Sequence, residues 1–256
     1  MKLVKLISAF LLLSLLVSCT TNDDEEQNTA NIQRAAKINV QLALNYMQEN
    51  NLVRAKQKLM LANKQAPDSA LVNGAMAYYS ERTGDNKRAE TYYKQAIDVA
   101  DVKGGPENNY GTFLCRQGHY EQAEKYFNEA ATDPEYLNTG KAYVNAGLCA
   151  LLVPKPDVAK QYFEKALQQN PDSSSALLEL AKLEFDQADY KQANTYLQTY
   201  MKKVTTPNAE ALWLAIRVAQ RAGDINSVKT YGSLLRADFP NSKQYQQFQQ
   251  LQASLT

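Results

Sequence analysis

The stretch NNYGTFLCRQGHYEQAEKYFNEA, residues 108–130, decides the fold. Its second half places Ala123, Phe127 and Ala130 at four- and three-residue intervals, which is the period of an α-helix with one apolar face. Gly118 stands just before that half, where a residue that accepts a left-handed backbone ends one helix and lets the chain turn. The stretch therefore predicts two helices joined by a tight turn.

The same pattern recurs along the chain. The small residue at position 123 returns at intervals of 34, 34, 36, 34 and 35, as Ala55, Ala89, Ala123, Ala159, Ala193 and Val228. A parallel column runs twelve residues earlier, as Ala43, Ala77, Gly111, Gly147, Ala181 and Ile216. A period near 34 with alternating small and large residues resembles the tetratricopeptide repeat. The resemblance implies an all-α superhelix of six helical hairpins over residues 34–242.

The last units depart from the pattern, because Tyr200 and Gly232 interrupt its columns. The terminal segment, residues 243–256, carries Tyr245, Phe248 and Leu251 on one side and glutamines elsewhere. Terminal repeats need their apolar face shielded from water. We therefore expect a C-terminal capping helix that covers the last hairpin.

Residues 1–18 have the layout of a secretory signal. Lys2 and Lys5 precede an apolar run that ends at Val17, and small Ser18 follows. The run is too short for a membrane-spanning helix, which needs roughly 20 apolar residues. A permanent transmembrane anchor is therefore the weaker interpretation.

Residues 16–19, LVSC, resemble the cleavage box of bacterial lipoproteins. The resemblance implies that Cys19 becomes the first mature residue and carries acyl chains, palmitate among them. Thr20 stands where an Asp would favour the inner membrane, so we expect a lipid anchor in the outer membrane, at its periplasmic face. Residues 19–33 are polar and acidic, which predicts a flexible tether. An ordinary signal peptide with an incidental cysteine is the alternative.

Composition excludes several classes of function. Lys and Arg number 28 against 27 Asp and Glu, so no broad basic surface for nucleic acid is expected. One histidine excludes multi-histidine metal sites, and His119 lies in a predicted turn. Gly104-Gly105-Pro106 has no following lysine and is a poor phosphate loop. We expect no enzyme, no cofactor and no metal.

A binding surface is the remaining expectation. Stacked helical hairpins form an inner groove, mainly from the first helix of each unit, that holds a segment of a partner. Asn108 and Asn109 could clamp a peptide backbone, although capping and helix–helix bonds explain such amides equally well. The predicted groove residues are Leu44, Met47, Tyr78, Arg82, Asn108, Asn109, Thr112, Arg116, Val144, Asn145, Leu148, Leu151 and Lys182.

Cys115 and Cys149 lie in the first helices of neighbouring units. Those helices stack side by side in such repeats, and an oxidising periplasm favours the pairing of close cysteines. We expect a disulfide, with two buried thiols that point apart as the alternative. The 16 tyrosines are expected to pack within and between the units.

A more specific resemblance rests on residues 108–115, NNYGTFLC, and on Asn145-Ala146-Gly147-Leu148-Cys149. Together with the lipoprotein box, these motifs resemble the PilW/PilF family of pilotin lipoproteins, which act in type IV pilus biogenesis. The resemblance extends over all six units and weakens beyond residue 200.

The resemblance implies a partner and a mechanism. The chain would hold a segment of the pilus secretin in its groove, and the lipid on Cys19 would direct the pair to the outer membrane, where the secretin forms multimers. Two alternatives stay open: a repeat lipoprotein that serves as a scaffold for outer-membrane protein assembly or for cell-wall enzymes, and a carrier of acyl chains.

Overall fold

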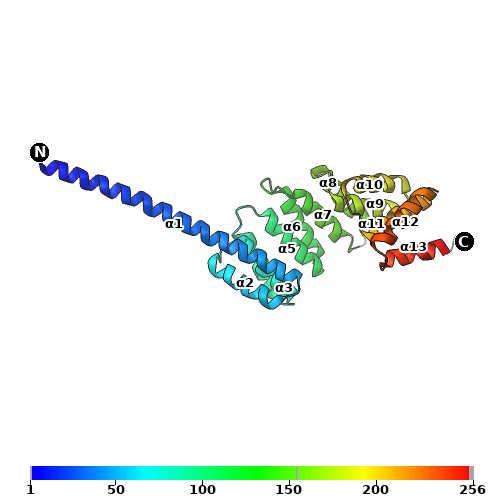
Figure 1. The fold of residues 1–256 in the computed structure, drawn as a ribbon, viewed down its shortest axis with the longest axis horizontal. Helices are drawn as coiled ribbons and strands as arrows, with labels where there is room; N and C mark the ends of the chain where they lie inside the picture. The colour runs from blue at the N-terminus through cyan, green and yellow to red at the C-terminus, as the bar shows by residue number, and fades with distance from the viewer. Residues whose placement is uncertain (1, 154, 254–256) are drawn as a thin grey trace. The chain divides into compact units, whose positions relative to one another are not determined.

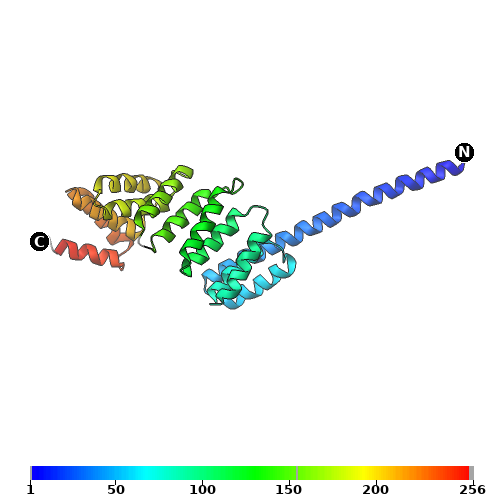
Figure 2. The same ribbon diagram turned by 180° about the vertical axis from the view of Figure 1, so that it is seen from behind.

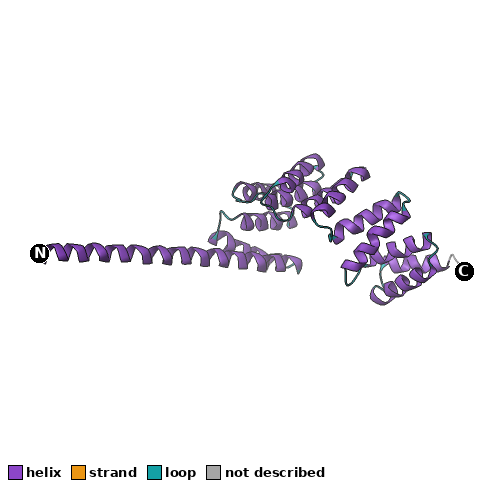
Figure 3. Cartoon of the chain, turned by 90° about the horizontal axis from the view of Figure 1, so that it is seen from above, coloured by secondary structure: helices purple, strands orange, loops and turns teal. Residues whose placement is uncertain are grey.

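The structure is a computed structural model that describes the backbone of residues 2–153 and 155–253 and, within these ranges, the side chains from Glu25 onward. These residues form helices and the loops between them, with no strand among them (Figure 3). The helices are α1 (Lys2–Gln48), α2 (Leu52–Gln65), α3 (Ala70–Arg82), α4 (Asn86–Asp98), α5 (Gly104–Arg116), α6 (Tyr120–Thr132), α7 (Thr139–Ala150), α8 (Pro156–Gln169), α9 (Ser174–Asp186), α10 (Tyr190–Lys203), α11 (Ala209–Arg221), α12 (Ile225–Asp238) and α13 (Lys243–Ala253).

The chain divides into two compact units, Met1–Tyr110 and Gly111–Thr256, and the boundary falls inside α5. In the first unit α1 packs on α2, and α3 packs on α4 (Figure 1). In the second unit the pairs are α7 with α8, α9 with α10 and α11 with α12. Helix α5 packs on α6 through Gly111 and Phe127. The prediction of six helical hairpins in an all-α tetratricopeptide-repeat fold is confirmed.

Helix α1 is longer than the first hairpin requires. Its last turns pack against α2 and α3 through a stripe that contains Val40 and Ala43, while its earlier turns extend beyond them (Figure 1). Residues 19–33, expected to be a flexible tether, are part of this continuous helix. No glycine or proline interrupts the segment, so the helix of the packed end propagates into it one hydrogen bond per residue. Residues 25–34 are all exposed, as expected for a segment without a core.

The side chains of residues 2–24 lie outside the described part of the molecule. The predicted signal segment and Cys19, the predicted site of lipidation, therefore belong to a region of which only the backbone is described. Within the described residues, no helix is both long enough and apolar enough to cross a bilayer.

The small-residue columns are where paired helices touch. Ala55, Ala123 and Ala193 have no exposed surface. A Cβ atom on Gly147 would lie 2.6 Å from Cε1 of Phe163, so the backbone of α7 approaches α8 more closely than an alanine allows. The sequence pattern thus sets the distance between the helices of a pair.

The hairpin turns are fixed by left-handed residues and by helix caps. Gly118 has φ of 83°, and Ala188, at the corresponding place between α9 and α10, has φ of 63°. Asp189 follows, and its side chain accepts a hydrogen bond from the backbone N–H of Gln192, which caps α10. A carboxylate at this position also interacts favourably with the helix dipole.

The terminal helix supplies an aromatic ring to the core of the last hairpin. Helix α12 has Gly232 where other second helices carry Phe127 or Phe163. Helix α13 lies against α11 and α12 (Figure 2). The ring of Phe248, on α13, occupies the space above Gly232, and Phe248 is 4% exposed. Phe248 packs with Ile216 of α11. The expected capping helix is confirmed, and it completes the hairpin that it covers.

Candidate partner-binding surface

In the first unit, the predicted groove residues divide into exposed and buried sets. Arg82 is exposed, and its Nη2 donates a hydrogen bond to Asn50 Oδ1 at 3.3 Å. Tyr78 and Leu44 are half-buried, and Leu44 packs against the core of the first two hairpins. Met47 has no exposed surface. Arg82 and Tyr78 therefore offer surface to a partner, whereas Met47 does not.

The amides at the start of α5 also differ from each other. Asn109 is exposed, but Asn108 is 2% exposed and lies inside the protein. Asn108 belongs to a buried stripe of α5 that also contains Gly104, Gly111 and Cys115, each three or four residues from the next. The proposed clamp of two adjacent amides is therefore reduced to Asn109, because residues one apart on a helix face different directions.

In the second unit, two predicted residues meet across neighbouring helices. Asn145 Nδ2 on α7 donates to Thr112 Oγ1 on α5 at 3.4 Å, and both are half-buried. Arg116, at the end of α5, is exposed. The structure thus brings Thr112 and Asn145 together as a polar link between the first helices of two hairpins.

Helix α7 presents apolar surface to solvent. Leu148 is 41% exposed and Leu152, just beyond the helix, is 61% exposed. Leu151 is half-buried, while Val144 is only 9% exposed and belongs to the core. An apolar patch at the end of one helix is a candidate contact for a partner, since large exposed apolar side chains that gather in one place mark interaction sites.

Lys182 on α9 is held by two carboxylates. Its Nζ lies 2.7 Å from Glu179 Oε1 and 2.8 Å from Glu210 Oε1, the latter on α11. Burial works against the charge of Lys182, but the hydrogen bonds that its Nζ donates to Glu179 and Glu210 outweigh this effect, so the pKa of Lys182 is raised. Lys182 therefore stays charged, but its charge is neutralised within the protein.

The two cysteines of the motifs form a disulfide. Cys115 of α5 and Cys149 of α7 are joined, with 5.9 Å between their Cα atoms. Neighbouring hairpins are thus bonded covalently through their first helices, beside the link between Thr112 and Asn145. Both sulfurs belong to buried residues.

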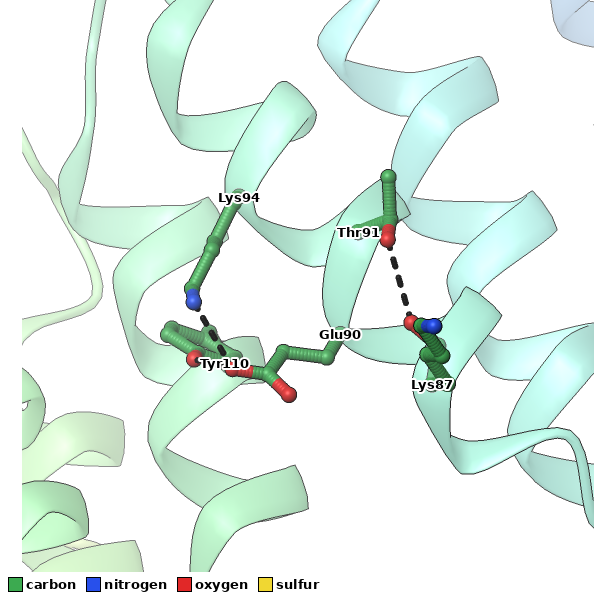
Figure 4. A network of polar contacts seen from close by, with 5 residues as sticks. All are labelled: Lys87, Glu90, Thr91, Lys94 and Tyr110. Carbon is green, nitrogen blue, oxygen red and sulfur yellow. Dashed lines mark hydrogen bonds and ion pairs between the residues drawn. The ribbon is translucent and has the colours of Figure 1, made fainter.

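Tyrosines also join neighbouring hairpins. In the first unit, Tyr110 donates its hydroxyl to Glu90 Oε1 at 3.2 Å, and Lys94 Nζ lies 2.7 Å from the same oxygen (Figure 4). The Tyr110 ring stacks on that of Tyr93 with 6.0 Å between centroids. A hydrogen bond to Glu90 is the main reason that the pKa of Lys94 is raised.

A second tyrosine network lies between α6 and α8. Tyr162 donates its hydroxyl to Glu124 Oε1 at 2.7 Å and accepts a hydrogen bond from Asn128 Nδ2 at 3.2 Å. Burial, followed by the hydrogen bond to Glu124, raises the pKa of Tyr162 to about 12. Lys165 lies over the Tyr162 ring, 5.4 Å from its centroid. These contacts assign both tyrosines to packing between hairpins, as the sequence predicts.

Sequence reasoning missed the arginines of α11. Arg217 stands 35 residues after Lys182, which is one repeat later, and the repeat spacing alone could have placed it on the same face. Arg221 follows one helical turn later. Among the described residues, no three side chains of the metal-ligating types lie close enough to hold a metal ion.

Known proteins match this architecture along most of the chain. Tetratricopeptide repeat models match residues 71–101, 114–174 and 155–212. The type IV pilus assembly protein PilF of Pseudomonas aeruginosa is 34% identical over 242 residues, which cover 94% of this chain and 96% of PilF.

Two solved structures agree with that match. The structure of Pseudomonas aeruginosa PilF superposes with a TM-score of 0.70 at 33% identity, over 86% of this chain and 98% of that one. The crystal structure of PilW, a widely conserved type IV pilus biogenesis factor, gives 0.69 at 27% identity, over 83% of this chain and 97% of PilW. Repeat proteins of this architecture present extended concave surfaces that bind other molecules. The chain belongs to the PilF/PilW family of tetratricopeptide-repeat proteins.

Proposed function

We propose that the chain is an outer-membrane lipoprotein of type IV pilus biogenesis that binds the pilus secretin and promotes its localisation and multimerisation. The observation that carries this proposal is the 34% identity to the pilus assembly protein PilF over nearly the full length of both chains. A match of that extent includes every hairpin, and so includes the surfaces through which a repeat protein acts.

The solvent-facing residues of the first helices suit a peptide ligand. Leu148 and Leu152 offer apolar surface in the second unit, and Arg116 is an exposed cation at the end of α5. In the first unit, Tyr78 and Asn109 combine a ring and an amide on the corresponding helices. Such mixed surfaces bind an extended or helical segment through apolar anchors and backbone hydrogen bonds.

The role assigned to the lipid follows from the sequence. Acyl chains on Cys19 would anchor the chain firmly, because several chains on one residue bind a bilayer far more strongly than one. The helical segment that follows would keep the repeats close to the membrane surface. The chain then acts as an adaptor that brings a secretin subunit to the membrane, and no covalent bond is made or broken.

The test uses a strain that lacks the gene. We expect this strain to lose heat-resistant secretin multimers and surface pili, and the wild-type gene to restore both. A Cys19→Ser variant should restore less, with the secretin multimers displaced from the outer-membrane fraction. Multimer levels that do not change in the deletion strain would contradict the proposal. Recovery of barrel-assembly proteins in a pull-down, in place of the secretin, would favour a general scaffold.

A further inference from the structure

Two neighbouring first helices of the second unit, α9 and α11, carry cations with different surroundings. Lys182 on α9 is paired with two carboxylates, and Lys160 pairs with Glu184 of α9 at 2.8 Å. Among the described side chains, residues 25–153 and 155–253, Arg217 and Arg221 of α11 form no ion pair. Glu179, Glu184 and Glu210 are therefore paired with lysines, and the two guanidinium groups of α11 have no carboxylate partner among the described side chains.

Each of these guanidinium groups is held by an aromatic ring. Arg217 Cζ lies 4.1 Å from the centroid of the Phe185 ring, and Arg221 Cζ lies 5.5 Å from that of Tyr190. The two rings also contact each other, with 5.2 Å between their centroids. Stacking uses the flat face of a guanidinium and leaves its N–H donors free at the edge. The rings thus fix the position of both groups without consuming their hydrogen bonds.

The spacing of the arginines suits one carboxylate-bearing segment. Residues four apart on a helix have Cβ atoms about 5–6 Å from each other. Arg221 is exposed and Arg217 is half-buried, so both can reach a ligand at the surface of α11. Arginine binds a carboxylate through two parallel hydrogen bonds, and less side-chain freedom is lost when the guanidinium is already held in place.

An apolar cavity adjoins the arginines. It has a volume of about 390 Å³ and lies between α10, α11 and α12. Leu197 and Val218 belong to its apolar lining. Its polar and charged lining residues are Tyr190, Lys191, Asn194, Gln198, Asp224, Ser227 and Tyr231. Tyr190 belongs to both features, since its ring lies under Arg221 and also lines the cavity. A hollow with an apolar lining and a few polar groups is the usual form of a pocket for an apolar group.

We propose that this surface binds a partner peptide in which an acidic residue lies beside a large apolar one. The carboxylate would bind Arg217 and Arg221, and the apolar side chain would enter the cavity beside Tyr190. The proposal goes beyond the binding of the secretin by the solvent-facing residues of the first helices. It concerns a site at α10–α12 and a peptide of defined chemistry. It is tested without the secretin, so either proposal can fail alone.

The experiment is selection from a phage-displayed library of random peptides on the immobilised mature chain. We expect the selected peptides to be enriched in Asp or Glu next to Leu, Ile, Met or Phe. Fluorescence anisotropy then measures the affinity of a selected peptide in labelled form. Replacement of its acidic residue by the amide, or of its apolar residue by alanine, should weaken binding at least tenfold.

Variants of the chain locate the site. Arg217→Gln with Arg221→Gln should weaken binding at least tenfold, and the double lysine variant should recover only part of it, because lysine lacks the planar fork. Asn194→Trp, at an exposed position on the rim, should block the cavity. Arg236→Gln removes an exposed charge from the same unit and is the matched control, which should bind as wild type.

Three results would overturn the proposal. They are a library that yields no enrichment over the bare surface, selected peptides without acidic residues, and equal affinity for the double glutamine variant and the wild type. Circular dichroism of each variant checks that the helices are retained, which the exposure of Arg221 and Asn194 favours.

Discussion

The hairpins formed by α5–α8 and those formed by α9–α12 follow one sequence pattern but are stabilised differently. The former are joined by the disulfide of Cys115 and Cys149, and Phe163 fills the space above Gly147 within its own hairpin. The latter have no disulfide, and the last hairpin needs Phe248 of α13 to fill the space above Gly232. A hairpin whose sequence departs from the repeat pattern can therefore be completed by a side chain from a neighbouring helix.

The largest expected difference between the two regions comes from the disulfide. The bond closes a loop of 34 residues, and in the chain-entropy model its loss lowers the free energy of unfolding by about 4 kcal/mol. Urea unfolding with and without reductant measures this. The variant with Cys115→Ala and Cys149→Ala is the control, since its stability should not respond to reductant. A wild-type chain whose stability is the same in reductant would contradict the role given to the bond.

Removal of the Phe248 ring should have the next largest effect on stability. Phe248→Ala should lower the free energy of unfolding by about 3 kcal/mol, because a buried ring is replaced by a cavity at the end of the repeat array. Hydrogen exchange should localise the loss of protection to α11–α13. Gln249→Ala, an exposed neighbour on the same helix, should change little. If exchange rises equally in α7 and α8, the last hairpin is not the part that Phe248 completes.

A smaller effect is expected where a hairpin is already filled. Gly147→Ala should cost about 2 kcal/mol, since the added Cβ would lie 2.6 Å from the Phe163 ring and would force α7 and α8 apart. Gly74→Ala is the matched control, because its Cβ would meet no atom within 4 Å and the better helix former should stabilise α3 slightly. Thermal unfolding of the pair compares them directly. Equal shifts for the two variants would show that the close approach of α7 and α8 has no energetic consequence.

The smallest effect concerns the turn before α10. Ala188→Gly should raise the free energy of unfolding by about 0.5–1 kcal/mol, because glycine accepts the φ of 63° without the strain that an alanine has there. Ala222→Gly changes the same side chain at the end of α11, where φ is −83°, and should not stabilise the protein. A loss of stability for Ala188→Gly in chemical denaturation would contradict this account of the turn.

The sequence predicts the hairpins well because their signal is local. Small residues such as Ala123 and Gly147 recur at the repeat period, and each must lie where two helices touch. The repeat spacing also predicts that Met47 and Asn108 are buried. Met47 is four residues after Ala43, and Asn108 is three residues before Gly111, so each shares a helix face with a buried small residue. The prediction that both residues line the groove did not take this spacing into account.

Other features depend on contacts that no local pattern contains. Lys182 is neutralised by Glu210, and that pairing requires the relative position of α9 and α11. The contact of Phe248 with Gly232 likewise joins residues on different helices. The helical form of residues 19–33 follows from continuity with the packed end of α1, although the composition of that segment alone favours disorder.

The central claim is that the solvent-facing side of the first helices binds the pilus secretin. It is tested most directly by the affinity of the purified mature chain for secretin multimers, with Leu148→Glu compared to Leu137→Glu. Leu148 lies in the patch on α7, whereas Leu137 lies in the loop before α7 and is 94% exposed, so the same charge is added at a position outside the proposed surface. We predict at least tenfold weaker binding for Leu148→Glu and wild-type affinity for Leu137→Glu. Wild-type affinity for both variants, or no binding by the wild-type chain, would contradict the claim.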